Sequence, residues 1–445
     1  MSLHAKYTQG SISRSLVQLS LPAALTIFLN ISFIAVDTIF LAHYSQDTLV
    51  AISFCFPVAI LFQMIANGFG IAAASVLSRH LGANKIIEGQ SAVIALLSLS
   101  FMVSLIILPL SFLGIDTIAV MTAVPEKYSA LFHDFLSIWF CGFFFVLVNF
   151  IGSSVLRVYG QPLKVARIQI ISCLINLVLS PILIFSLDMG IAGSALAGVI
   201  ARCLTSIWIT IEIKRAAFSQ CGSLSIVCSL EKWAQHVRSI MSIAIPAVMS
   251  NAIGPLAIIF LVHLLARYGD SVVAGFGIAA RIETLAVAPL FALSASLSPV
   301  IGQNFGATFF ERGYHTLKIS YLWCLIWGAV ITFALALFGH ALSLCFSQDK
   351  GVLNIATLYL LILPCSYAFW GIIMMTNANF NAIGKPFVST CITLVRLGVL
   401  FIPLCFLLGR YFGYPGLFFA FMLSNILTSI LCWYLSRRLW RSQLA

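Results

Sequence analysis

Residues Leu16 to Tyr44 read LVQLSLPAALTIFLNISFIAVDTIFLAHY, a stretch that is apolar almost throughout and holds one carboxylate, Asp37. About 20 apolar residues are enough for a helix to cross a bilayer. An aspartate near the centre of such a helix costs roughly 2.5–3.5 kcal/mol on insertion scales. Binding a proton or pairing with a cation relieves this cost. We therefore interpret the stretch as a membrane helix and Asp37 as its chemical centre.

The composition is that of a membrane protein. Hydrophobic residues make up 61% of the chain and charged residues only 8%, whereas a soluble domain carries about 25% charge. The net charge of +11 comes from basic residues that lie between apolar runs, so membrane topology explains it better than nucleic-acid binding. Most of the twelve cysteines lie inside apolar runs, and none stands at zinc-like spacing with histidine. We therefore expect neither a metal site nor a disulfide framework.

Apolar runs separated by short polar turns divide the chain into twelve expected crossings. They fall at roughly 16–43, 49–78, 90–113, 132–157, 163–186, 190–213, 239–266, 271–302, 315–340, 354–381, 387–408 and 416–436. An even number of crossings puts both termini on one side of the membrane. Seventeen basic residues fall in the connections on that side and four on the other. Because positive charge marks the cytoplasm, we expect a multi-pass protein of the bacterial inner membrane with both termini in the cytoplasm.

The chain contains an internal repeat. An offset of 224 residues superposes Pro22 on Pro246, and near the ends of the halves an offset of 223 superposes Gly193 on Gly416. Gly82-Ala83 meets Gly306-Ala307, Gly160 meets Gly384, and Pro162 meets Pro386. Each half holds six crossings, so both halves have the same orientation. Parallel repeats of this kind are one plan of secondary transporters, with the substrate site near the repeat interface.

The longest polar interval separates the two halves. We expect an N-terminal lobe at 1–215, a cytoplasmic linker at 216–238 and a C-terminal lobe at 239–445. The fold class is an all-α integral membrane protein with twelve transmembrane helices in two six-helix bundles.

Asp37 has no counterpart in the second half, where the offset leads to Leu261. The carboxylate is therefore not a structural need of the repeat. Asn30 lies seven residues before it and shares its helix face. On the fifth crossing, Asn176 and Ser180 lie one turn apart, and Pro181 frees backbone carbonyls nearby. We predict an N-lobe pocket formed by Asp37 and the residues Asn30, Asn176, Ser180, Pro22 and Pro181, in which Pro22 lets the first helix bend.

Four other charges are embedded in apolar runs. Glu283 and Arg281 lie two residues apart on one helix, so they do not face each other. We favour a structural ion pair of Glu283 with Arg396 or Arg281, with a second protonation site as the alternative. These three residues form the candidate C-lobe polar site. Arg202 lies one helix turn or more from the cytoplasmic end of its run, and its long side chain can extend toward the interface.

Several stretches resemble the multidrug and toxic compound extrusion (MATE) family, and most of all its prokaryotic DinF-like branch. They are LSLPAAL at Leu19–Leu25, VDTIFLA around Asp37, HLGANKIIEG at His80–Gly89, RIETLAVAPLFALSASLSPVIGQNFGA at Arg281–Ala307 and NFNAIGKP at Asn379–Pro386. The run PVIGQNFGA at Pro299–Ala307 is the most specific piece. The resemblance covers nearly the whole chain.

The resemblance implies two V-shaped lobes around a central cleft and export of amphipathic or cationic drugs against inward H⁺ or Na⁺. It implies that Asp37 is the cation-coupling acid and that Asn176 shares its pocket. The family often has a second acid at the place of Ser180 and a threonine at the place of Gly198. Some sodium-driven members also carry acids near Gly254 and Ile372, which are uncharged here. These departures favour H⁺ over Na⁺, which prefers several oxygen ligands.

We therefore predict a proton-coupled multidrug exporter that contributes to antibiotic resistance, with Asp37 protonation as the switch. The chain lacks a Walker motif and a catalytic Ser/His/Asp arrangement, so we expect no enzyme activity and no cofactor. We expect a monomer in the lipid bilayer with small drugs as partners and no nucleic acid. One alternative is a lipid-linked precursor flippase, for which Arg202, Arg281 and Arg396 would bind pyrophosphate. A non-transporting receptor or assembly factor is the other.

Overall fold

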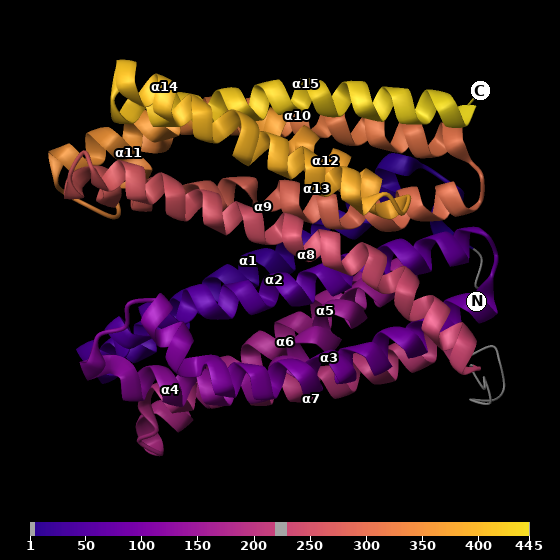
Figure 1. The fold of residues 1–445 in the computed structure, drawn as a ribbon, viewed down its shortest axis with the longest axis horizontal. Coiled ribbons are helices and arrows are strands. Elements are labelled where there is room, and N and C mark those ends of the chain that lie inside the picture. The colour runs from indigo at the N-terminus through magenta and orange to yellow at the C-terminus, as the bar shows by residue number, and fades with distance from the viewer. Residues whose placement is uncertain (1–4, 219–228, 445) are drawn as a thin grey trace. The chain divides into compact units, whose positions relative to one another are not determined.

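In a computed structural model of the protein, residues 5–218 and 229–444 are described, apart from the side chains of 33–35. These residues are mostly helical and contain no β-strand (Figure 1). The helices are η1 (Lys6–Thr8), α1 (Ile12–Tyr44), α2 (Gln46–Gly82), α3 (Ile86–Met121), α4 (Glu126–Cys141), α5 (Phe143–Val158), α6 (Pro162–Pro181), η2 (Ile182–Ser186), α7 (Gly190–Phe218), α8 (Leu230–Ala266), α9 (Asp270–Gly306), α10 (Phe310–Leu344), α11 (Lys350–Ile362), η3 (Leu363–Ser366), α12 (Tyr367–Ala382), α13 (Pro386–Leu394), η4 (Val395–Phe401), α14 (Ile402–Phe412) and α15 (Tyr414–Leu444).

The prediction of twelve crossings is confirmed for the described part of the chain. Eleven spans are long and apolar enough to cross a membrane, and the bent pair α4–α5 makes the twelfth. The pair bends by 48° at Gly142, where a Cβ atom would lie 2.5 Å from the Val199 side chain of α7. Two other spans contain π-helical turns, η2 and η4.

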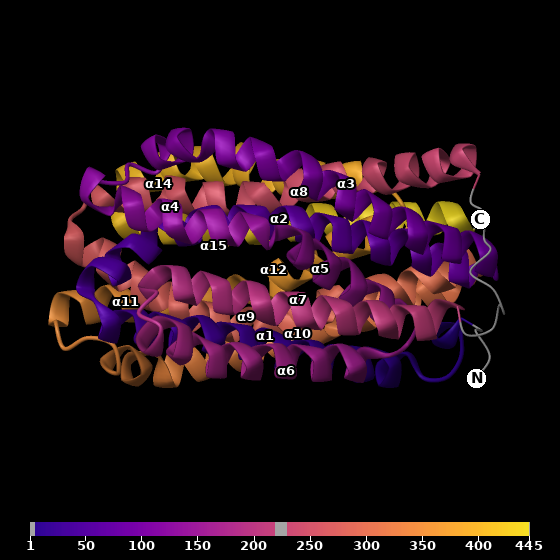
Figure 2. The same cartoon turned by 90° about the horizontal axis from the view of Figure 1, so that it is seen from below.

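The chain forms two compact units. Unit 1 comprises Met1–Lys6 and Leu25–Val248, and unit 2 comprises Tyr7–Ala24 and Met249–Ala445. Within unit 1, α2 packs against α5, and α7 packs against α5 and α6. Within unit 2, α9, α10 and α12 pack against one another. In each unit the long helices lie roughly lengthwise across both views, and the chain reverses direction between successive spans (Figures 1 and 2).

The first helix of each repeat passes from one unit to the other. α1 leaves unit 2 between Ala24 and Leu25, and α8 leaves unit 1 between Val248 and Met249. These two crossing points are 224 residues apart, so they are equivalent in the repeat. Each lies two residues after a proline, Pro22 or Pro246, which removes one helical hydrogen bond at that place.

The beginnings of these two helices are part of the core of the unit in which they lie. Leu16 and Leu19 of α1 belong to the hydrophobic core of unit 2. Ile240 and Ile243 of α8 belong to the core of unit 1. The expected lobes at 1–215 and 239–445 assigned both helix starts by chain order. The compact units divide these helices differently because the apolar faces of their first turns pack in the unit of the other repeat.

The expected linker at 216–238 is largely helical where the structure describes it. α7 continues to Phe218 and α8 begins at Leu230, while residues 219–228 lie outside the described part of the chain. Polar contacts hold the first turns of α8 in unit 1. Lys232 and His236 pair with Glu88 at 3.9 and 3.1 Å, and Trp233 donates to Ser98.

The repeat is also visible in the backbone. Left-handed residues, which break helices and reverse the chain, recur at the offsets found in the sequence. Asn84 and Thr308 have φ of 57° and 60°, Gly160 and Gly384 have φ of 74° and 79°, and Gly190 and Gly413 have φ of 50° and 66°. Pro162 and Pro386 then occupy the first positions of α6 and α13, where proline costs no hydrogen bond.

Candidate cation-coupling site

Asp37 of α1 lies half-buried in unit 1 between two serine hydroxyls. Ser180 near the end of α6 donates to Asp37 Oδ1 at 3.1 Å. Ser194 in the first turns of α7 donates to Asp37 Oδ2 at 2.5 Å. Both serines are buried, at 1% and 3% exposure. Each carboxylate oxygen therefore has a buried hydroxyl group within hydrogen-bond distance.

A break in the fifth span brings both hydroxyls to Asp37. α6 ends at Pro181 and the chain continues as the π-helical turn η2. α7 then packs against this turn through Gly193, where a Cβ atom would lie 2.8 Å from the Leu183 carbonyl. Because Gly193 has no side chain, α7 approaches η2 closely, and the next residue, Ser194, reaches Asp37.

Asn176 extends the site by one residue. It is buried one helix turn before Ser180, and Ser180 Oγ lies 2.7 Å from Asn176 Oδ1. The Ser180 hydroxyl has one hydrogen, yet it has two acceptors within hydrogen-bond distance, Asn176 and Asp37. It can donate to only one of them at a time. The predicted association of Asp37, Asn176 and Ser180 is thus present in the structure.

Asn30 lies elsewhere. Its amide donates to the Thr26 carbonyl at 2.8 Å and its oxygen accepts from Gln169 at 3.1 Å, at an exposed position. The structure records no hydrogen bond between Asn30 and Asp37, although both lie on α1. Seven residues on a helix place two side chains on one face, but about 10 Å apart along the axis, so a shared face did not ensure contact.

The two prolines of the predicted pocket differ in their place. Pro181 ends α6 directly after Ser180, so it helps to form the site. Pro22 lies inside α1 in the part that belongs to unit 2, about four helical turns before Asp37.

The C-lobe residues form two separate arrangements. Glu283 of α9 is buried and accepts a hydrogen bond from the Tyr359 hydroxyl of α11. The Arg396 guanidinium of η4 lies over the rings of Trp370 and Phe421, at 5.7 and 5.9 Å from their centroids. Arg281 is exposed. Among the ion pairs of the described residues, none includes Glu283. Its hydrogen-bond partner is Tyr359, and the charge of Arg396 acts on it without a direct contact.

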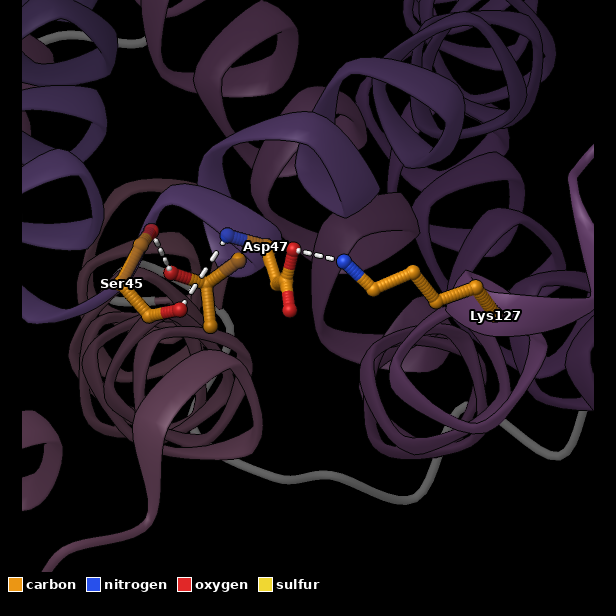
Figure 3. Close-up of polar contacts among 4 residues, drawn as sticks. Ser45, Asp47 and Lys127 are labelled. Carbon is orange, nitrogen blue, oxygen red and sulfur yellow. Dashed lines mark hydrogen bonds and ion pairs between the residues drawn. The ribbon is translucent and has the colours of Figure 1, made fainter.

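Asp47, an exposed acid that follows the end of α1, differs from Asp37 in its surroundings. Asp47 stands in the first turn of α2, which Ser45 caps by accepting from the Asp47 backbone amide (Figure 3). The Asp47 carboxylate pairs with Lys127 at 2.7 Å, and both side chains are exposed. Asp47 is exposed and has a lysine as its partner, whereas Asp37 is half-buried and has hydroxyl groups.

Sequence reasoning missed Ser194 as a residue of the site and Gln169 as the partner of Asn30, and it did not relate Arg202 to Asp37. Ser194 follows two glycines of the sixth span, Gly190 and Gly193, and such small residues favour close helix packing. That pattern was the available signal. Gln169 is a polar residue within an apolar run, but nothing in the sequence pairs it with Asn30. Arg202 was noted, but not next to Asp37.

Replacing Ser194 with alanine should make Asp37 hold its proton to higher pH. The Ser194 hydroxyl donates to the ionised carboxylate, and a donor of this kind favours the charged form. Its loss should move the pH midpoint of the transport rate upward by about one pH unit, for roughly 1.4 kcal/mol of lost interaction. Initial rates measured across pH in proteoliposomes would check this. An unchanged pH profile would mean that Ser194 does not act on the carboxylate.

Comparisons with known proteins agree with the two-unit fold and its repeat. The family model MatE matches the chain twice, over residues 22–182 and 246–407. The chain belongs to the MatE family. The two matches begin 224 residues apart, at the same offset as the sequence repeat. The members that this chain resembles are transporters, so MatE membership makes it a multi-pass membrane transporter and not an enzyme.

Three relatives show which members of the MatE family the chain resembles. The FAD transporter of Shewanella oneidensis is 31% identical over 96% of this chain and 95% of its own length. The multidrug export protein MepA of Staphylococcus haemolyticus is 24% identical over 96% and 94%. A crystal structure of a mutant of the Vibrio cholerae MATE transporter VcmN superposes with a TM-score of 0.91 at 25% identity, over 97% of each chain.

Proposed function

We propose that this MatE protein exports amphipathic or cationic drugs in exchange for inward protons, and that Asp37 is the residue that binds the proton. The observation that carries the proposal is the embedded carboxylate of Asp37, held by the hydroxyls of Ser180 and Ser194 and lacking a counterpart in the second repeat. The drug-exporting relative MepA supports the substrate class.

The hydrogen-bond geometry suits a group that alternates between two protonation states. When Asp37 is ionised, it accepts from Ser194 and competes with Asn176 for the single hydrogen of Ser180. When Asp37 is protonated on Oδ1, it can donate to Ser180 Oγ, which is then free to donate to Asn176. In the protonated state both serine hydroxyls and the Asp37 carboxyl group have hydrogen-bond partners, and the ionised state keeps at least one strong donor. Neither state leaves an unpartnered carboxylate in the membrane, which would be costly.

Proton binding can be coupled to a movement of α1. Asp37 lies in the part of α1 that belongs to unit 1, whereas Pro22 lies in the part that belongs to unit 2. In the proposed cycle, a proton from outside neutralises Asp37, α1 bends near Pro22, and the drug leaves. After the site opens to the cytoplasm, Asp37 releases the proton and a new drug binds. In the proposed orientation of the protein in the membrane, both termini lie in the cytoplasm.

The driving force sets limits on what one proton can export. A membrane potential of 100 mV contributes about 2.3 kcal/mol per charge, and one pH unit contributes about 1.4 kcal/mol per proton. For a monocation exchanged against one proton the voltage contributions cancel, so only the pH gradient remains. A neutral substrate gains the voltage contribution once, and each negative charge on the substrate adds it again.

Flux measurements in liposomes test the proposal. Purified protein is reconstituted and ethidium or norfloxacin transport is recorded under an imposed pH gradient and, separately, under a Na⁺ gradient. We expect flux under the pH gradient alone. Flux that follows only the Na⁺ gradient would replace the proton by Na⁺. An absence of flux under both gradients would contradict drug export.

A second candidate substrate is a flavin nucleotide. It is favoured by the 31% identity with a protein described as an FAD transporter, which exceeds the identity with MepA. In the liposome assay, FAD fluorescence replaces ethidium as the readout. Export of FAD without export of ethidium would change the substrate class while leaving the coupling proposal intact.

A lipid-linked precursor remains the substrate of the flippase alternative. The three arginines that suggested this alternative have different surroundings. Arg202 belongs to unit 1, Arg281 is an exposed residue of unit 2, and Arg396 is buried over aromatic rings. The alternative predicts that arginine variants lose function and that Asp37→Asn does not.

A further inference from the structure

Arg202 is a second embedded charge in unit 1. It lies on α7 eight residues after Ser194, which is about two helical turns, so the two residues share a face. The residue is half-buried, and none of the ion pairs of the described residues includes it. An arginine within a span normally faces a partner or a water-filled cavity.

The guanidinium of Arg202 turns back toward the site. A Cβ atom on Gly198 would lie 3.0 Å from Arg202 Nη1 and 3.5 Å from Asn176 Nδ2. Both head groups therefore border the space that Gly198 leaves open, one helix turn before Arg202. This direction agrees with the tilt of helical side chains toward the start of the helix. From the sequence we expected the Arg202 side chain to extend toward the cytoplasmic end of α7. It points instead toward the start of the helix.

Arg202 and Asp37 act on each other through their charges. The Asp37 carboxylate is sensitive to the positive charge of Arg202, and Arg202 to the negative charge of Asp37. Among the described residues, Cys173 is the remaining titratable group that acts on Arg202, and no other charged group acts on Asp37. Arg202 and Asn176 border the same space beside Gly198, and Ser180 lies within hydrogen-bond distance of both Asn176 and Asp37. None of the ion pairs of the described residues joins Arg202 to Asp37.

The charge balance of the pocket follows from this arrangement. With Asp37 ionised, the carboxylate and the guanidinium cancel, and the pocket is neutral without any bound cation. With Asp37 protonated, the pocket carries one positive charge. A Na⁺ ion at the oxygens of Asp37, Ser180 and Ser194 would also have to overcome the repulsion of Arg202 in a medium of low dielectric constant, where that repulsion is strong.

We propose that Arg202 is a positioning residue that serves as the fixed counter-charge of ionised Asp37, and that it makes the site bind H⁺ in preference to Na⁺. The inference rests on the proposed function of Asp37. The arginine occupies the space left by Gly198 and replaces the cation that a bare carboxylate would need. It also allows Asp37 to give up its proton on the cytoplasmic side.

Infrared titration of the purified protein tests this inference without transport. The protonated-carboxyl band of Asp37 is assigned by its loss in Asp37→Asn and is then followed against pH. In Arg202→Gln we expect the midpoint to rise by about one pH unit or more, which is tenfold tighter proton binding. Arg202→Lys keeps the charge and should stay close to wild type. Arg215→Gln removes a charge from the same helix about 20 Å away and should leave the midpoint unchanged.

A sodium series completes the experiment, and its wild-type arm needs no variant. In the wild type, replacing choline with Na⁺ should leave the Asp37 midpoint unchanged, whereas in Arg202→Gln we expect Na⁺ to lower it by competing with the proton. An equal midpoint in Arg202→Gln and wild type would overturn the inference, as would a sodium-dependent midpoint in the wild type. If Arg202→Gln does not fold, the wild-type series and Arg202→Lys still decide. Normal titration without any drug flux would refute the proposed function and leave the inference standing.

Discussion

Export driven by a pH gradient should fall to the level of protein-free liposomes when Asp37 is replaced by asparagine. Asparagine has nearly the same shape and can still hydrogen-bond with Ser180 and Ser194, but it cannot bind or release a proton. The site would be locked in a state that resembles protonated Asp37. Since antiport needs both states, we expect a loss of at least about 100-fold, or roughly 2.7 kcal/mol per cycle, in initial rates of ethidium efflux.

The matched control for this variant is Asp47→Asn. It makes the same chemical change in an exposed acid that pairs with Lys127 at the start of α2 (Figure 3). We expect its export rate to remain within about twofold of wild type, because exposed ion pairs contribute little. Retained export in Asp37→Asn, with both variants inserted at wild-type levels, would remove Asp37 from the coupling mechanism.

The largest loss of stability is expected for Gly416→Ala. A Cβ atom at Gly416 would overlap the Leu408 carbonyl oxygen and would lie 3.0 Å from the Gly409 amide nitrogen. Backbone atoms cannot turn aside as a flexible side chain does, so α15 would have to move away from α14. Overpacking of this kind costs about 1–3 kcal/mol and occasionally more. Thermal unfolding in detergent should show a melting temperature several degrees lower than that of wild type.

Gly193→Ala is the equivalent variant in the first repeat, and Gly277→Ala is the control. Gly193→Ala meets the Leu183 carbonyl in the equivalent place of unit 1, and because Ser194 follows directly, export should fall together with stability. Gly277 of α9 has no atom within 4 Å of its Cβ position. Gly277→Ala should leave the protein as stable or slightly more stable, since alanine favours helix by about 1 kcal/mol. A Gly416→Ala protein as stable as Gly277→Ala would contradict the close packing of α14 and α15.

The fold could be predicted well from the sequence because its main determinants are local. Apolar runs give the spans, and the glycines and prolines that reverse the chain recur at a fixed offset. Gly160 and Gly384, which the offset superposed, adopt positive φ at equivalent places. The family match begins at Pro22 and again at Pro246, the same two residues that the offset superposed.

The exchange of helix starts between the units could not be predicted in this way. It depends on where the apolar faces of the first turns of α1 and α8 pack. Residues such as Leu16 and Ile240 look the same in the sequence whichever unit buries them. From chain order we assigned each helix as a whole to one lobe. In the structure, α1 is divided between the units after Ala24 and α8 after Val248.

The candidate site was predicted in part for a similar reason. Asp37, Asn176 and Ser180 could be brought together because each is a polar residue inside an apolar run, next to a helix break. Ser194 depends on the close approach of α7 at Gly193, which only the structure reveals. Arg202 depends on the absence of a side chain at Gly198. Small residues decide these contacts, and a sequence indicates only that space is available, not what fills it.

The most direct test of the account is a count of the protons released when a drug binds. Ethidium is added to the purified protein in weakly buffered detergent solution, and a pH indicator reports the protons that appear. We expect about one proton per bound ethidium for the wild type under conditions in which Asp37 starts protonated, and none for Asp37→Asn. Binding of ethidium to the wild type without proton release, or equal release from the variant, would contradict the claim that Asp37 is the proton switch.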